Sequence, residues 1–140
     1  MTLDIGQTQD IAACRALRFT VFVDEQNVPP EEEIDDLDDA AIHMIVRRDG
    51  KPVGTARMLI QGDTGKIGRV CVLACERGRG TGAALMQACL DRLQDEPDVV
   101  RAKLSSQTHA IAFYEALGFS AYGPEYDDAG IPHRDMVREL

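Results

Sequence analysis

A glycine-rich turn is the feature of this sequence best suited to binding a charged ligand. It runs from Gly78 to Gly82 with glycine at alternate positions, and it carries Arg77 beside it and Arg79 within it. Glycine tolerates positive φ, so successive backbone N–H groups can point into one concavity, and a helix N-terminus behind them adds partial positive charge. The turn therefore predicts a pyrophosphate site, with a plain connection between a strand and a helix as the alternative.

The turn differs from the common nucleotide-binding motifs. No Gly-Lys-Ser or Gly-Lys-Thr follows Gly80 or Gly82, which excludes a P-loop. The alternating glycines and the alanine at position 83 also depart from the dinucleotide fingerprint. A nucleotide-binding module that uses the same turn is the weakest of three functional hypotheses.

A second block follows the turn after about thirty residues. It reads AFYEALGF and runs from Ala112 to Phe119. Together with Arg77-x-x-Gly80-x-Gly82, it resembles the GNAT superfamily of N-acetyltransferases over roughly residues 40–122. The segments VFVDEQ (21–26), IGRV (67–70) and GIPH (130–133) resemble the ElaA-like subgroup and extend the likeness over nearly the whole chain.

The resemblance implies a fold and a cofactor. The expected fold is a single α/β (α+β) GNAT domain over residues 1–140, with a central mixed, mostly antiparallel sheet of six to seven strands and about four helices. Two strands, ending near Val72 and Leu104, should splay apart to admit the pantetheine arm of acetyl-CoA. The residues expected to bind acetyl-CoA are Val70, Cys71, Val72, Arg77, Gly78, Arg79, Gly80, Thr81, Gly82, His109, Phe113 and Tyr114.

The chemistry implied is attack of a primary amine, on a small molecule or a protein, on the thioester in a ternary complex. The resemblance puts Tyr114 beside the coenzyme sulfur as general acid, because an ordinary tyrosine is protonated at neutral pH. A backbone N–H near Val72 is the expected oxyanion donor. His109 is expected to contact pantetheine or to serve as base. Simple packing of Tyr114 in a short apolar helix is the alternative.

The acceptor side is less defined. The residues expected to bind the acceptor are Glu25, Gln26, Arg69 and His133. Glu33 is the expected general base, which removes a proton from the attacking amine. The other candidate bases are Glu25, Asp35, Asp36 and the two histidines, acting directly or through water. A non-catalytic acyl-CoA sensor or interaction module is the second functional hypothesis, and the sequence identifies neither the acceptor nor the acyl-chain preference.

The charge distribution excludes some partners. The segment from Asp24 to Asp39 contains nine acidic residues and no basic residue, and it accounts for the whole formal net charge of −9. Because phosphate backbones require a basic face, nucleic acid is not an expected partner. The segment could attract a cationic acceptor or could be a solvated loop. It lacks the spacing and the glycine of an EF-hand, and no metal is expected.

Hydrophobic periodicity and turn residues predict the elements that hold these residues. The strands are expected at 3–5, 41–48, 51–60, 67–73, 99–104, 119–122 and 133–138, with a hairpin at Asp49-Gly50. The helices are expected at 8–22 with Thr8 as N-cap, from the glycine turn to about 94, and at 108–117 with Gly118 closing the last. The acidic segment should begin irregularly, because Pro29 and Pro30 block a helix interior.

Cysteine spacing and hydropathy indicate the state of the thiols and the location of the protein. The four cysteines show no metal-ligand spacing and are expected to be reduced thiols, three of them packed in the core. The sequence contains no apolar stretch long enough to cross a membrane and no secretory signal, so the cytoplasm is the expected location. A homodimer is expected only from the family.

Overall fold

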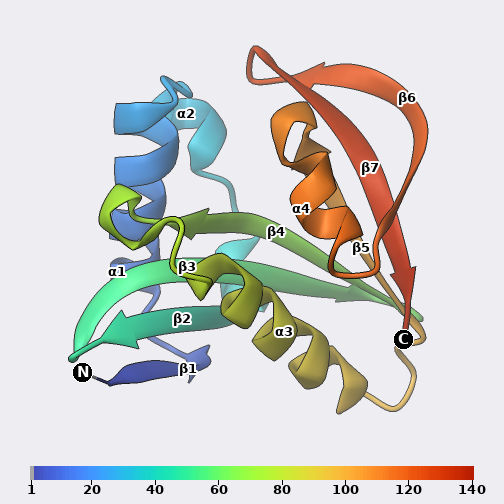
Figure 1. The fold of residues 1–140 in the computed structure, drawn as a ribbon, viewed down its shortest axis with the longest axis horizontal. Helices are drawn as coiled ribbons and strands as arrows, with labels where there is room; N and C mark the ends of the chain where they lie inside the picture. The colour runs from blue at the N-terminus through green and yellow to red at the C-terminus, as the bar shows by residue number, and fades with distance from the viewer. Residues whose placement is uncertain (1) are drawn as a thin grey trace.

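A seven-stranded mixed sheet forms the centre of the protein. The computed structural model describes residues 2–140 and gives the strand order β1-β2-β3-β4-β5-β7-β6 (Figure 1). The strands are β1 (Leu3–Thr8), β2 (Ile42–Arg48), β3 (Lys51–Gln61), β4 (Thr64–Val72), β5 (Arg101–Gln107), β6 (Ser120–Asp128) and β7 (Ile131–Glu139). The helices are α1 (Ile11–Arg18), a π-helix (Phe19–Glu25), α2 (Pro30–Glu33), α3 (Thr81–Gln94) and α4 (Ile111–Glu115), with short 3₁₀ turns at Asp38–Ala40, Ala74–Glu76 and Thr108–Ala110.

The parallel pair β4–β5 opens in the middle of the sheet. These two strands pair only from Thr64 to Ile67 on β4 and from Arg101 to Leu104 on β5, whereas every other neighbouring pair is antiparallel. Beyond that register β4 continues to Val72 and β5 to Gln107 without pairing to each other. The expected mixed, mostly antiparallel sheet with a splayed pair is therefore confirmed.

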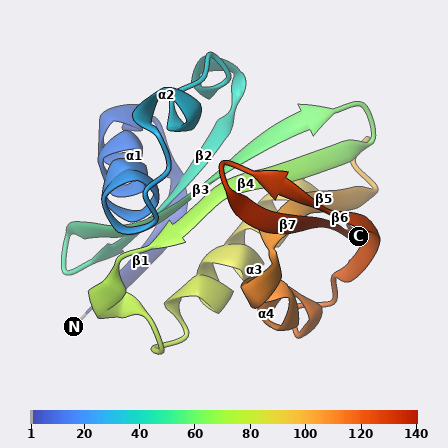
Figure 2. The ribbon, with the colours of Figure 1, turned by 90° about the horizontal axis from the view of Figure 1, so that it is seen from above.

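Helices cover the two faces of the sheet unequally. The helix α3 packs on β1 to β4, and α4 packs on β5 and β6, both on one face. On the other face α1 packs on β2, β3 and β4, and Figure 2 shows that α1 and α2 stay over that half of the sheet. The same face of β5 and β7 has no described helix over it, so the opening between β4 and β5 can be reached from that side.

Two apolar clusters hold the layers together. The larger lies between the sheet and α3, whose Leu85, Leu90 and Leu93 are fully buried at helical spacing. Burying a leucine side chain contributes roughly 2 kcal/mol. The smaller joins α1 to the sheet through Cys14, Leu17, Val21, Ile45 and Cys71. The cysteines are free, with three buried and Cys75 exposed, as the sequence predicts.

Local turn chemistry explains the boundaries that the sequence predicted well. Asp49 and Gly50 both have positive φ, at 52° and 84°, as a two-residue hairpin of the β2–β3 type requires. Gly118 has a φ of 92° just after α4 and the turn that follows it, where a left-handed residue ends the helical segment.

Several predicted boundaries are wrong. The N-cap of α1 is Asp10, whose Oδ1 accepts from the Ala13 N–H, whereas Thr8 ends β1. Pro30 does not prevent a helix, because it occupies the first position of α2, where its missing N–H has no cost. The strand β6 extends to Asp128 through Pro124, which is tolerated because β6 is an edge strand.

Candidate active site

A cleft of about 510 Å³ lies where β4 and β5 separate. Besides β4 and β5, its walls come from the π-helix, from α2, from the turn before α4, and from the β6–β7 turn. The expected site residues that line it are Gln26, Glu33, Arg69, Val70, Cys71, Val72, Arg77, His109, Tyr114 and His133. The expected residues outside its lining are Glu25, Phe113 and the stretch Gly78, Arg79, Gly80, Thr81 and Gly82. Segments distant in the sequence therefore meet around one opening.

The inner edge of β4 presents backbone groups to this cleft. The Leu73 N–H donates to the Val53 carbonyl of β3 at 2.9 Å. Because successive N–H groups of a strand point to opposite sides, those of Val72 and Val70 point away from β3. On that side β5 has already diverged, so an extended ligand can pair with β4 as a further strand would.

A bulge in β4 turns Arg69 toward the acidic segment. The β3–β4 register shifts between Thr55 and Arg57, and opposite that shift Arg69 has a φ of 51°. Its Nη2 donates to the Glu33 carbonyl and to Asp35 Oδ2, each at 3.2 Å. Positive φ is costly for a residue with a side chain. The bulge is therefore a strained feature in the lining of the cleft.

The glycine turn after β4 forms an open backbone cradle. Gly78 and Gly80 have φ values of 77° and 79°, and the first hydrogen bond within α3 runs from the Ala84 N–H to the Gly80 carbonyl at 3.0 Å. No intrahelical acceptor is available to the three N–H groups before Ala84, which are those of Thr81, Gly82 and Ala83. Free N–H groups at a helix N-terminus are suited to bind phosphate oxygens.

Glu76, a residue that sequence reasoning missed, anchors the turn. Its buried carboxylate accepts from Arg48 Nε at 2.8 and 2.9 Å and from Thr81 Oγ1 at 3.1 Å, and Arg79 Nη1 lies 3.2 Å away. Burial alone would raise the pKa of Glu76, but the hydrogen bonds from Arg48 and Thr81 outweigh it and lower the pKa. Thr81 is therefore held by its side chain and contributes its backbone to the cradle.

Arg77 and Glu25 bind each other at the mouth of the cleft. Arg77 donates to the two carboxylate oxygens of Glu25 at 2.7 and 2.9 Å, and its Nε donates to the Val72 carbonyl at 3.1 Å. Both side chains are substantially exposed, so the pair is worth about 1 kcal/mol or less. An anionic ligand could therefore displace Glu25 from Arg77 at little cost.

Tyr114 lies on α4 and lines the cleft. Burial raises the pKa of its hydroxyl to about 12. Its ring contacts the Phe113 ring edge to face, with centroids 5.0 Å apart. The Phe113 ring also lies close to Gly82, since a Cβ added at Gly82 would be 3.5 Å from it. The side chain is thus held in an apolar setting that keeps its proton on.

A chain of side-chain hydrogen bonds fixes His109. Its Nε2 lies 2.6 Å from Gln107 Oε1, and Gln107 Nε2 donates to Gln26 Oε1 at 2.9 Å. Because the Gln107 oxygen can only accept, the proton of His109 sits on Nε2 and Nδ1 is left as an acceptor. Gln107 is a cleft residue that the sequence analysis did not identify.

His133 is held in the opposite tautomer. It is buried, and its Nδ1 lies 2.7 Å from the Ile131 carbonyl, so Nδ1 carries the proton and Nε2 is a free acceptor. Tyr126 stacks on the ring at 6.2 Å between centroids. The Tyr126 hydroxyl donates to Asp135 Oδ1 at 2.6 Å and also contacts Ser105 Oγ, which lines the cleft.

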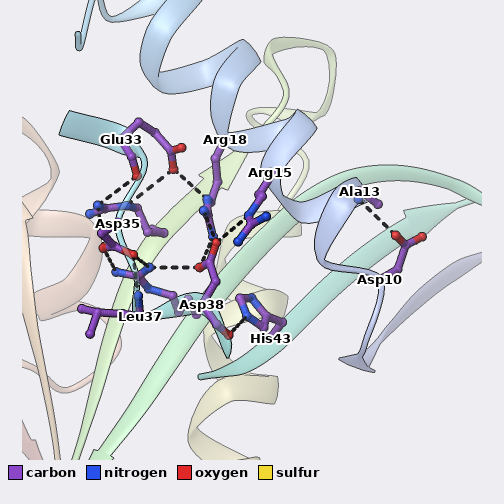
Figure 3. A network of polar contacts seen from close by, with 11 residues as sticks. Asp10, Ala13, Arg15, Arg18, Glu33, Asp35, Leu37, Asp38 and His43 are labelled. Atoms are coloured by element: carbon purple, nitrogen blue, oxygen red, sulfur yellow. Dashed lines mark hydrogen bonds and ion pairs between the residues drawn. The ribbon is translucent and has the colours of Figure 1, made fainter. Parts of the chain in front are cut away.

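Arginines from other elements bind part of the acidic segment (Figure 3). Asp38 accepts from Arg15, Arg18 and Arg57 at 2.8 to 3.0 Å. Hydrogen bonds from Arg18 and its neighbours hold the pKa of Asp38 far below its usual range. The segment is therefore not a simple solvated loop.

Two more acids of the segment join this network. Arg57 binds Asp35 through two hydrogen bonds of 2.8 Å, and these lower the pKa of Asp35. Glu33, the expected base, is 4% exposed and its Oε1 accepts from Arg18 Nε at 2.7 Å, with Arg69 Nε 3.6 Å away. Glu33 thus lines the cleft while one of its oxygens is committed to an ion pair.

No helix within residues 2–140 is long and apolar enough to cross a membrane. Over the same residues, no group of three or more His, Cys, Asp or Glu side chains is arranged to hold a metal ion.

Comparison with known proteins gives a consistent result. Residues 8–140 match the family model described as an acetyltransferase (GNAT) domain. The uncharacterized N-acetyltransferase YjcF of Bacillus subtilis is 40% identical over 124 residues, which cover 88% of this chain and 88% of that protein. Protein ElaA of Escherichia coli is 35% identical over 132 residues, which cover 89% of this chain and 84% of ElaA.

Solved structures agree with the sequence relatives. An acyl-CoA N-acyltransferase from Pseudomonas aeruginosa superposes with a TM-score of 0.88 at 32% identity, covering 98% of this chain and 99% of that one. The crystal structure of Escherichia coli ElaA superposes with a TM-score of 0.87 at 29% identity, covering 99% and 100% of the two chains. The likeness therefore extends over the whole domain.

Proposed function

Because this chain belongs to the GNAT family of acetyltransferases, in its ElaA-like group, and is an acyl-CoA-dependent N-acyltransferase, we propose that it transfers acetyl from acetyl-CoA to a primary amine. The transfer is a direct attack within a ternary complex. The observation that carries this proposal is the cleft between β4 and β5, which has Tyr114 and His133 in its lining and is followed, directly after its lining residue Arg77, by the open backbone turn of residues 78–82.

Coenzyme A is proposed to bind along β4. Its pyrophosphate accepts from the N–H groups of residues 78–83, and Arg77 and Arg79 supply positive charge. The pantetheine arm pairs with the backbone of Val70 and Val72. Cys71, Phe113 and His109 complete the coenzyme surface, and the N–H of Val72 is the proposed donor to the thioester oxygen.

The reaction needs two proton movements. The amine nitrogen attacks the thioester carbonyl carbon, a C–N bond forms, and the C–S bond breaks. Tyr114 gives its proton to the departing thiolate, and its raised pKa suits an acid that must stay protonated until that step. The attacking nitrogen loses a proton to a base, and exchange with solvent returns the proton to Tyr114.

His133 is the base that the geometry supports best. His133 lines the cleft, and in its neutral form Nε2 is left as an acceptor, whereas Glu33 Oε1 is engaged by Arg18. His109 and Glu33 are the competing candidates for this role. Arg69, Gln26 and Glu25 are proposed to contact the acceptor, with Glu25 acting after it releases Arg77.

The open acceptor side favours an enzyme over a sensor. A protein that only senses acyl-CoA needs neither a protonated tyrosine beside the sulfur nor a second approach to the thioester. The cleft continues past Tyr114 to Arg69, Ser105 and His133, which gives an amine a route to the carbonyl.

A thiol-release assay tests the proposal. Purified protein is incubated with acetyl-CoA and a panel of alkylamines, diamines, amino acids and peptides, and mass spectrometry identifies any acetylated product. We expect CoA release that depends on the amine and an acetylated nitrogen in the product. Binding of CoA without acetylation of any amine in a broad panel would instead identify a non-catalytic binder.

A further inference from the structure

Two of the three lysines of the chain lie side by side at the acceptor end of the cleft. Lys66 of β4 and Lys103 of β5 are Cα partners in the parallel pairing, so both side chains leave the same face of the sheet. Lys66 is exposed and Lys103 is half-buried. Every ion pair among residues 2–140 uses arginine, and none involves either lysine.

The two lysines line a second depression that continues the cleft. This depression has a volume of about 260 Å³ and also includes Thr64, Tyr122 and Asp135. Lys66 lines both it and the cleft between β4 and β5. Because Leu104 also belongs to both linings, the two spaces adjoin, and one acceptor molecule can occupy both.

The charge of the depression favours an anion. Its one carboxylate, Asp135, already accepts the hydrogen bond of the Tyr126 hydroxyl at 2.6 Å. Lys103 Nζ lies 5.6 Å from the centroid of the Tyr122 ring, an arrangement that holds the ammonium group without neutralising it. Two ammonium groups against one carboxylate make a local positive excess in a protein whose formal net charge is −9.

The register of β5 sets the length of the ligand. His133 is the Cα partner of Gln107, and Lys103 lies four residues before Gln107 on the same strand. Four residues of a strand span about 13 Å, and side chains shorten the gap that a ligand must bridge to about 10 Å. An α-amino acid is too short for this separation.

We propose that Lys66 and Lys103 form a subsite for an oxyanion, carboxylate or phosphate, at the far end of the acceptor. The acceptor is thus an amine that carries its acidic group about 10 Å from the reacting nitrogen, as in a long ω-amino acid or a short peptide with a free carboxylate. This inference rests on the proposed function, since the amine must sit beside His133.

Acceptors matched in length test the subsite. We would compare kcat/KM for 8-aminooctanoate, 8-aminooctanol and the aminoalkyl phosphate of the same length, with β-alanine as the short acid. The double variant Lys66→Gln/Lys103→Gln removes the subsite. Lys51→Gln, in the β2–β3 hairpin, removes one lysine charge elsewhere and is the control.

We expect the wild type to prefer the long acid over the alcohol by about tenfold, which is what two partly exposed ion pairs supply. The double variant should lose this preference and keep its rate with the alcohol, whereas Lys51→Gln should retain the preference. A larger gain with the phosphate than with the carboxylate would identify a phosphorylated acceptor. Equal rates for acid and alcohol in the wild type, or a preference that survives in the double variant, would overturn the subsite.

Calorimetry separates this inference from the proposed function. The same compounds are titrated into the protein–CoA complex, in which no transfer can occur. Tighter binding of the acids in the wild type than in the double variant would support the subsite even if no amine were acetylated. Equal binding of acid and alcohol would contradict it whatever the turnover.

Discussion

At the residue scale, single hydrogen bonds to backbone or amide oxygens set the chemistry of the cleft histidines. The Ile131 carbonyl accepts a hydrogen bond from the Nδ1–H of His133, and Gln107 Oε1 accepts one from the Nε2–H of His109. The two imidazoles therefore offer different nitrogens to the cleft. Tyr114 needs no such partner, because burial alone keeps its hydroxyl protonated.

Tyr114→Phe tests the proposed acid. We expect kcat to fall about 100-fold, within the usual contribution of general acid catalysis, while CoA affinity changes by less than about twofold. Stopped-flow thiol release and calorimetry with CoA measure the two effects. Because burial raises the pKa of Tyr114 to about 12, the wild-type rate should show no loss from ionisation of this group below about pH 11. An unchanged kcat in Tyr114→Phe would remove this residue from the mechanism.

His133→Gln tests the proposed base. Glutamine can keep a polar group in the same place but cannot accept a proton, so kcat should fall about 100-fold and the rise of rate with pH should flatten. Tyr126→Phe keeps the stacking ring and removes only the hydroxyl contacts with Asp135 and Ser105, so kcat should fall much less. The measurement is the pH dependence of kcat for the three proteins. If His133→Gln keeps the wild-type profile and the same change at His109 or Glu33 abolishes it, the base is reassigned.

At the element scale, the junction between β4 and α3 is the proposed site for the CoA pyrophosphate. Two left-handed glycines separate a strand edge from a helix N-terminus, and the buried Glu76 ties the junction to β2 through Arg48. The amides are thus held in an open arrangement before any ligand arrives. Preorganised donors cost little to order on binding.

Gly80→Val tests the cradle. A β-branched side chain at a φ of 79° forces the backbone to rearrange, and we expect CoA affinity to fall at least tenfold by calorimetry. Gly50→Val is the matched control, because Gly50 has a φ of 84° with open space around it but lies in the β2–β3 hairpin. Gly50→Val should lower the melting temperature without changing CoA affinity. Equal CoA affinity in the two variants would show that the CoA phosphates bind elsewhere on the protein.

At the scale of the whole molecule, the arginine–acid network joins α1, the acidic segment and the sheet. Arg18 comes from α1, Arg57 from β3 and Arg69 from the bulge of β4, and all three converge on the segment between α2 and β2 (Figure 3). One wall of the cleft between β4 and β5 therefore contains buried ion pairs. Buried pairs of this kind are strongly destabilising to break, because the partner charge is left without compensation.

Asp38→Asn tests the network. We expect it to lower the free energy of unfolding at pH 7 by about 3 kcal/mol, whereas Asp36→Asn, an exposed acid in the same segment, should change it by less than about 0.5 kcal/mol. Urea unfolding measures both. A similar small effect in the two variants would show that the network contributes little to stability.

The pH dependence of stability gives an independent check. The pKa of Asp38 is lower in the folded protein than in the unfolded chain, so its ion pairs stabilise the fold fully above the unfolded pKa of about 4. That stabilisation is lost as the pH falls toward the folded value. Wild-type stability should therefore drop below about pH 5, and Asp38→Asn should show a shallower drop over the same range. Parallel curves for the two proteins would contradict this linkage.

The sequence by itself determined the features that depend on neighbours along the chain. The glycine turn, the Asp49-Gly50 hairpin and the apolar face of α3 follow from φ preferences and from hydrophobic spacing, which are local properties. The motif residues also identified the family. The extent of β6 was missed because Pro124, Gly130 and Pro132 indicate a loop locally, and only the pairing of Tyr126 to Asp128 with β7 extends the strand.

Only the tertiary structure decided which charges are free. Nine acids in one segment suggest a negative surface, but Glu33, Asp35 and Asp38 are bound by arginines from α1, β3 and β4. The same holds for Lys66 and Lys103, which become neighbours through the register of two parallel strands. Ion pairing and burial depend on distances between segments far apart in the chain, and those distances exist only once the sheet has formed.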